Sequence, residues 1–208
     1  MLPPGEPRWR RRKADRPGEI IAAALEVFSE RGFTATRLDD VARQAGLSKG
    51  ALYLYFETKE DLFRAVVGEA VAANLAHLEQ AVQADLPFEQ TLRAGLTLLA
   101  NRLASDRRIS GVVKLVIAES RAMPELARIW HDTVIARALN MIITLIRRAQ
   151  ERGEVRTGDP RYLAMGVIGP MLLAMIWRET FEPVGAQPVA VEALAAQHLD
   201  VVLKGMRP

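Results

Sequence analysis

The chain has 208 residues, half of them hydrophobic, so it can bury a core in one domain or in a small domain joined to a larger one. It contains no cysteine, which excludes disulfides and thiolate chemistry and fits a reducing cytoplasm. Because the net charge is only +3, any affinity for nucleic acid must come from the local placement of basic residues.

The N-terminus has a local concentration of basic residues. Residues 1–16 hold six basic and two acidic side chains together with three prolines, a composition that predicts a basic arm, disordered when free. Arg10, Arg11 and Arg12 are candidates for contacts with DNA phosphates or a minor groove, and a solvated tail is the alternative. No apolar stretch of the length found in a secretory signal follows them.

The first helix is predicted to begin at Pro17, which lacks an amide hydrogen and suits a first helical turn. It should end at Gly32, where glycine adopts a left-handed conformation without steric cost. Ile21 and Phe28 belong to its buried stripe, and Phe33 should pack beneath the segment that follows. We expect this helix to be scaffold, because nothing in it has an evident chemical role.

Residues 36–59 indicate two short helices joined by a tight turn and followed by the start of a third. Thr36 has the spacing to cap the first helix, and Gly46 lies where a left-handed residue ends it. Ser48 is placed to cap a second helix over residues 49–56. Thr58 repeats the capping spacing before a third helix.

One face of the second short helix carries exposed tyrosine and leucine side chains, which are costly unless a partner covers them. A DNA major groove admits a helix, and tyrosine hydroxyls and backbone amides commonly contact phosphates. A lysine in the first turn of the third helix opposes the helix dipole, which favours a phosphate partner. The candidate DNA-binding residues of this segment are Thr36, Arg37, Ser48, Lys49, Gly50, Ala51, Tyr53, Leu54, Tyr55 and Lys59.

The same segment resembles the TetR family of bacterial transcriptional regulators. The residues that carry the resemblance are Thr36, Val41, Ala42, Ala45, Gly46, Leu47, Ser48, Gly50, Leu52, Tyr53, Tyr55, Phe56, Lys59 and Leu62. The resemblance implies an all-α protein, with a three-helix helix-turn-helix DNA-binding domain over residues 17–62. A larger helical domain for ligand binding and dimerisation would follow over residues 63–208. The alternative is an ordinary helical hairpin that happens to carry these residues.

The remainder of the chain reads as helices, and we find no strand pattern or repeat. The helices are predicted over residues 59–83, 88–105, 107–122, 124–152, 160–181 and 188–204. The charge-free run from Tyr162 to Trp177 is shorter than the roughly 20 residues that span a bilayer. We therefore expect a buried helix and no membrane partner.

The resemblance also implies a homodimer in which the last two helices of each chain form a four-helix bundle. The residues on one side of the last helix that we assign to this interface are Val191, Leu194, Ala195, His198, Leu199 and Val202.

A small-molecule pocket is expected in the larger domain. Such pockets are mostly apolar, and methionines adapt to varied ligand shapes. The candidate lining residues are Leu99, Leu103, Val113, Val116, Ile117, Trp130, Val134, Met141, Met165, Ile168, Met171, Leu172 and Met175. The alternative for most of them is an ordinary core position.

The sequence therefore predicts a cytoplasmic DNA-binding regulator, a repressor released from a near-palindromic operator by a small, largely apolar effector. Two alternatives stand beside it: an effector-independent architectural or cell-cycle DNA-binding protein, and a small-molecule-processing enzyme. Catalytic motifs are missing, and the three histidines lack metal-ligand spacing. We expect no enzymatic activity, no metal and no cofactor.

Overall fold

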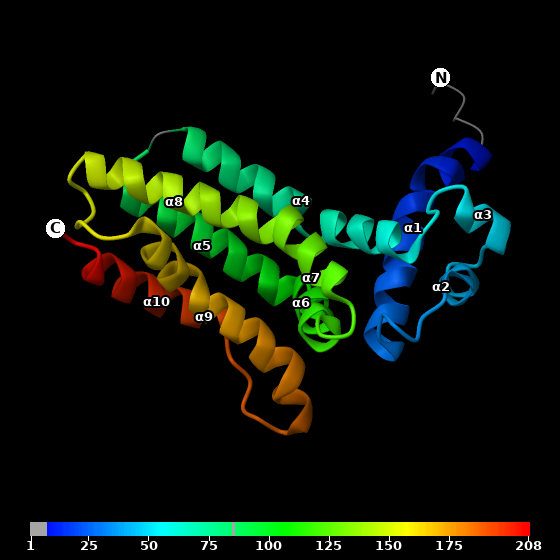
Figure 1. Ribbon diagram of the computed structural model, residues 1–208. Helices are drawn as coiled ribbons and strands as arrows, with labels where there is room; N and C mark the ends of the chain where they lie inside the picture. Colours follow the sequence, from blue (N-terminus) through cyan, green and yellow to red (C-terminus); the bar gives the residue numbers. More distant parts are fainter. Residues whose placement is uncertain (1–7, 85) are drawn as a thin grey trace, which may run out of the picture.

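The computed structural model describes residues 8–84 and 86–208, and every regular element in these ranges is a helix (Figure 1). A small N-terminal unit lies at one end of the molecule and a larger helical bundle at the other, and α4 runs from the first into the second. The N-terminal helices are α1 (Arg8–Arg31), α2 (Leu38–Gln44) and α3 (Lys49–Tyr53), followed by α4 (Lys59–Gln83). This arrangement confirms the all-α class with a helix-turn-helix unit and a larger helical domain.

The remaining helices form the bundle together with the second part of α4. Helix α5 contacts α10, and α9 contacts α6, α8 and α10. The elements are α5 (Phe88–Ser105), α6 (Arg108–Glu119), α7 (Pro124–Trp130), a π-helical turn (His131–Ile135), α8 (Ala136–Glu151), α9 (Pro160–Thr180), a 3-10 turn (Glu182–Val184) and α10 (Val191–Gly205).

The first helix is longer than predicted. It begins at Arg8 and passes through Pro17 instead of beginning there. Arginine, lysine and alanine are good helix formers, and they extend the helix although proline removes one of its hydrogen bonds. The expected disorder is therefore wrong for residues 8–16, whereas residues 1–7 lie outside the described part of the chain.

Aromatic packing forms the centre of the N-terminal unit. The ring of Phe33 lies 5.1 Å from that of Phe28 and 5.6 Å from that of Phe63, measured between centroids, and all three side chains are fully buried. Aromatic rings favour such tilted and edge-on contacts. Phe33 is thus a core residue of the unit, packed between α1 and α4.

The last helix begins three residues later than predicted. The amide of Val189 donates a hydrogen bond of 3.1 Å to the Glu182 carboxylate. This bond holds the segment before Val191 in an irregular conformation. The long helix predicted over residues 124–152 is continuous, but a π-helical turn at His131–Ile135 interrupts its α-helical hydrogen bonding.

Two stretches, Pro124–Glu151 and Pro160–Val184, have the length and apolar composition of membrane spans. This is weak evidence for a membrane, because core helices of globular domains meet the same criteria. In the second stretch the Arg178 side chain is turned into the protein and is 92% buried, as in a helix packed on its neighbours.

Candidate nucleic-acid interface

The turn between α2 and α3 has the predicted geometry. Gly46 is left-handed with φ +66°, and the Leu47 amide donates to the Ala42 carbonyl at 2.8 Å. The Ser48 hydroxyl accepts a hydrogen bond of 3.2 Å from the Ala51 amide and so caps α3. The left-handed Gly46 and these two hydrogen bonds fix the angle at which α3 leaves α2.

Thr36 does not cap α2, because that position belongs to Arg37, whose amide donates to the Asp40 carboxylate at 3.1 Å. The Thr36 side chain is buried, and its hydroxyl donates to the Gly32 carbonyl at 2.7 Å. The prediction that the Thr36 side chain contacts DNA is therefore wrong. The residue closes the loop between α1 and α2.

Helix α3 is shorter than predicted and ends at Tyr53, with Leu54 as its C-cap. Because the chain turns there, Tyr55 is half-buried and packs against the core. The core covers most of the Tyr55 side chain, so the assignment of Tyr55 to the outer face is wrong.

The outer face of α3 is exposed as predicted. Leu54 is 84% and Tyr53 is 42% exposed, and Lys49 and Gly50 lie on the same surface. Arg37 and Ser48 are exposed at its edge. A methyl group added to Gly50 would meet no atom within 4 Å, so the fold itself does not require glycine there.

Asp39 holds the lysine of this face in place. Its carboxylate lies 3.0 Å from the Lys49 ammonium, which also lies 5.7 Å from the centre of the Tyr53 ring. The hydrogen bond and the negative charge of Asp39 raise the pKa of Lys49 above its usual value. The lysine therefore stays charged beside the tyrosine.

Lys59 is turned inward, contrary to the prediction of a phosphate contact. Its ammonium donates to the carbonyls of Phe33 at 2.6 Å, Thr34 at 3.3 Å and Thr36 at 2.8 Å. Burial lowers the pKa of Lys59, and the carboxylates of Glu60 and Glu119 partly offset this effect. An ammonium has three protons, so these carbonyls leave none free for DNA. The role of Lys59 is to fix the α1–α2 loop.

Arg10, Arg11 and Arg12 belong to the first turns of α1. Their side chains lie outside the described part of the structure, and their contact with DNA stays a prediction.

The predicted dimer residues on α10 lie in the core of a single chain. Val191, Ala195, Leu199 and Val202 are buried against the bundle, so their side chains cannot reach a second chain. Leu194 and His198 are half-buried, and the His198 Nε2 lies 3.0 Å from the Val167 carbonyl oxygen. The assignment of this side of α10 to the dimer interface is wrong. Periodicity identifies an apolar side of a helix but not the surface that covers it.

The predicted pocket residues separate into core and surface. Three of them, Ile117, Met165 and Leu172, are exposed and cannot line an interior cavity. The buried ones are Leu103, Val113, Val116, Val134, Met171 and Met175, and the half-buried ones are Leu99, Trp130, Met141 and Ile168. A shallow recess where α1 and α4 meet the start of α6 contains none of them; it is lined by Ile21, Ala22, Leu25, Val66, Glu69, Ala70 and Arg108.

The exposed helix-turn-helix surface prompts a comparison with known DNA-binding families. The family of bacterial regulatory proteins of the tetR type matches residues 20–66, and a tetracyclin repressor-like C-terminal domain matches residues 84–190. The second match alone covers more than half of the chain. The chain belongs to the TetR family.

Relatives within the TetR family support this assignment over most of the chain. The transcriptional repressor BepR of Brucella suis is 30% identical over 71% of this chain and 72% of its own. The fatty acid metabolism regulator protein of Bacillus subtilis is 26% identical over 72% of this chain and 76% of its own. A TetR-family structure from Mesorhizobium loti is 26% identical, with a TM-score of 0.72 and coverage of 98% of this chain and 100% of that one. These relatives are regulators, and the chain is a DNA-binding transcriptional regulator of the TetR family.

The sequence does not reveal the positioning roles of two residues at this interface. Asp39 orients Lys49, and Glu119 accepts hydrogen bonds from the loop after α1. Both are ordinary acidic residues on helices. Only the tertiary structure brings Glu119 to a partner 86 residues away in sequence.

Proposed function

We propose that this protein is a homodimeric repressor that leaves a near-palindromic operator when a small, largely apolar molecule binds its C-terminal domain. The observation that carries the proposal is the outer face of α3, where an 84% exposed leucine lies beside a tyrosine and a glycine that the fold does not require. A major groove would cover these side chains, and glycine would let the backbone approach the DNA closely. BepR, a relative over most of the chain, is named a repressor.

A second copy of the chain is the proposed partner of α9. Tyr162, Met165, Leu173 and Ile176 recur at helical spacing on this helix, and the first three are more than half exposed. Helix α10 packs beside α9 and adds Val201, which is 63% exposed. An exposed apolar face of this kind is typical of a protein interface. Two α3 helices would then enter major grooves about 34–36 Å apart.

Helix α4 is the proposed route from effector to DNA. It begins with the Thr58 cap beside α3 and continues into the bundle, where it contacts α5, α7 and α8. An effector that binds one placement of α4 more tightly than another would shift the separation of the two α3 helices. One relative regulates fatty acid metabolism, so long-chain acyl compounds are the first effectors to test. Such a regulator would act in the cytoplasm.

Selection of binding sites from a random DNA library tests the proposed reading face. Tyr53→Phe removes one hydroxyl and should weaken binding on all sequences alike by about 1 kcal/mol, the usual worth of one hydrogen bond. Ala51 substitutions should instead change the preferred base at one position of each half-site, by about 1–3 kcal/mol. If Tyr53→Phe alters base preference while Ala51 substitutions do not, the proposed orientation of α3 is wrong.

Gly50→Ala separates folding from DNA binding. Alanine is the better helix former, and the added methyl group meets no protein atom, so thermal stability should rise by up to about 1 kcal/mol. Operator affinity should fall, because the methyl group holds the backbone away from the DNA. Calorimetry and a binding isotherm on the same preparation measure both effects. Unchanged affinity would exclude a close backbone approach at this residue.

Effector dependence distinguishes the proposal from an architectural DNA-binding protein. Operator affinity should fall in the presence of one class of apolar molecule, and the thermal midpoint should rise with its concentration. If acyl compounds and planar aromatic compounds both leave affinity and midpoint unchanged, the effector-independent function is favoured.

A further inference from the structure

The loop between α1 and α2 is held from the C-terminal domain by one carboxylate. Glu119 is the last residue of α6. Its Oε1 accepts a hydrogen bond of 3.1 Å from the Phe33 amide, and its Oε2 accepts one of 2.6 Å from the Thr34 hydroxyl. Hydrogen bonds to a charged acceptor are stronger than neutral ones. The contact therefore adds a charged hydrogen-bonding link to the packing of α1 and α4 on α6.

Gly32 makes room for this carboxylate. It is left-handed with φ +78°, and a methyl group built on it would lie 2.5 Å from the Glu119 Oε1. The left-handed conformation favours glycine there, and a larger residue would push the Glu119 carboxylate off the Phe33 amide. The turn that ends α1 is thus also the surface that receives Glu119.

Lys59 holds the same loop through its carbonyls. Its ammonium bonds to the carbonyls of Phe33, Thr34 and Thr36, so the loop joins the end of α6 to the start of α4. Thr36 directly precedes the N-cap of α2. A movement of α6 would therefore be passed to α2 and α4 together.

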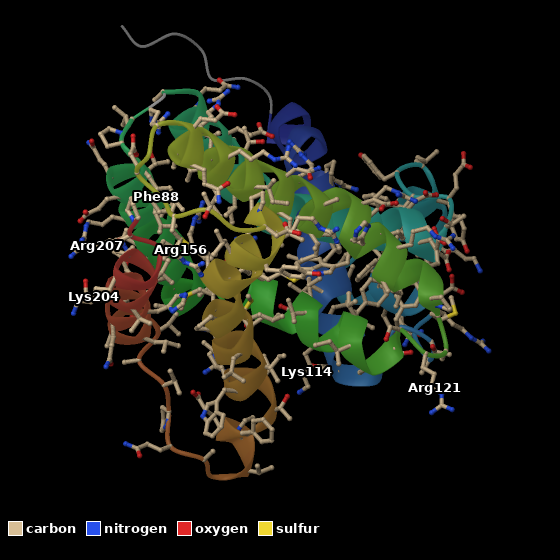
Figure 2. All side chains as sticks on the ribbon, turned by 60° about the vertical axis from the view of Figure 1, so that its left-hand side comes forward. Phe88, Lys114, Arg121, Arg156, Lys204 and Arg207 are labelled. Carbon is tan, nitrogen blue, oxygen red and sulfur yellow. The ribbon has the colours of Figure 1, made fainter. Side chains whose placement is uncertain are left out.

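The other end of α6 is tied to α9 by buried polar groups. The Ser110 hydroxyl accepts from the Arg178 guanidinium at 2.6 Å and donates to the Glu179 carboxylate at 2.8 Å. Arg178 also donates to the Leu103 carbonyl at the end of α5. In Figure 2, Lys114 lies on α6 and Arg121 lies just beyond its C-terminal end. Helix α6 thus has a polar connection at both ends.

We infer that Glu119 is a positioning residue through which α6 fixes the orientation of the DNA-binding unit relative to the bundle. Helix α1 packs on α6 and α4 runs on into the bundle, and the Glu119 contact adds a directional polar bond that holds the end of α1 against the end of α6. The orientation is a property of the single chain, and only its consequence for operator affinity rests on the proposed function.

The orientation can be measured directly because the chain has no cysteine. Spin labels at Glu57→Cys in the N-terminal unit and Arg147→Cys on α8, both exposed positions, give one distance distribution by pulsed electron double resonance. An excess of unlabelled protein confines the measurement to one chain, whether or not the chain dimerises. We expect a narrow distribution with Glu119 and a broad one with Glu119→Ala, while thermal stability stays sufficient for a folded protein.

Matched variants separate this role from general loss of structure. Thr34→Val and Glu119→Gln each weaken only part of the contact and should broaden the distribution less. Glu125→Ala is the control, because that carboxylate on α7 pairs with Arg128 and not with the N-terminal unit; its distribution should stay narrow. If Glu119→Ala does not fold, Thr34→Val decides in its place. A distribution as narrow as that of the wild type, in a folded variant, would refute the inference.

Operator affinity is a separate readout. Glu119→Ala should bind the selected operator about tenfold more weakly. This is the factor expected for the loss of one hydrogen bond to a charged group. Failure of the wild type to select any DNA would refute the proposed function, and the distance measurement would still decide the role of Glu119. Broadening without loss of affinity would refute the step from orientation to DNA binding.

Discussion

Leu173→Glu should convert the proposed dimer into monomers and reduce operator affinity at least about a hundredfold. Leu173 is 58% exposed on the outer face of α9, and a buried, unpaired carboxylate there would cost several kcal/mol on association. A monomer binds one half-site only. It lacks the high effective concentration with which the second subunit of a bound dimer finds the second half-site. Light scattering gives the mass, and a binding isotherm gives the affinity.

The control for this prediction is Ile117→Glu. Ile117 is 56% exposed on α6, so the same charge enters an equally exposed apolar position on a helix outside the proposed interface. This variant should remain dimeric. If both variants dimerise, or if only Ile117→Glu is monomeric, the interface is not on α9.

Local rules predicted the helix-turn-helix well because its geometry depends on neighbouring residues. The left-handed conformation of Gly46 and the Ser48 cap follow from contacts within a few residues. The same holds for Thr58, whose hydroxyl bonds to the Asp61 amide at 3.0 Å. Caps and glycine turns need no knowledge of the rest of the fold.

Residues whose partners are distant in sequence could not be placed in this way. Thr36 and Lys59 looked like surface polar groups, and only the tertiary structure turns them onto the α1–α2 loop. For α10, spacing identified an apolar side correctly, but α5 covers that side within the same chain. Periodicity fixes which residues share a face, and the packing of other helices decides what that face meets.

Among single substitutions in the N-terminal unit, Lys59→Met should be one of the most destabilising, at about 2–4 kcal/mol. The ammonium bonds to three carbonyls and lies 4.4 Å from the centre of the Phe33 ring. Hydrogen bonds to a charged group contribute about 1.5–3 kcal/mol each and are not additive. Methionine keeps much of the stem but leaves those carbonyls without their donor, so thermal unfolding of the purified protein should shift to lower temperature and operator binding should weaken with it.

Lys49→Met is the control for the destabilisation expected of Lys59→Met. Lys49 belongs to the same helix-turn-helix segment, but it is exposed and its ion pair with Asp39 is a surface pair, of the kind that contributes little to stability. The thermal midpoint should therefore stay almost unchanged in Lys49→Met, and operator selection should change instead. Equal midpoints for the two variants would mean that the carbonyl contacts of Lys59 do not hold the loop, and that its charge acts at the DNA surface after all.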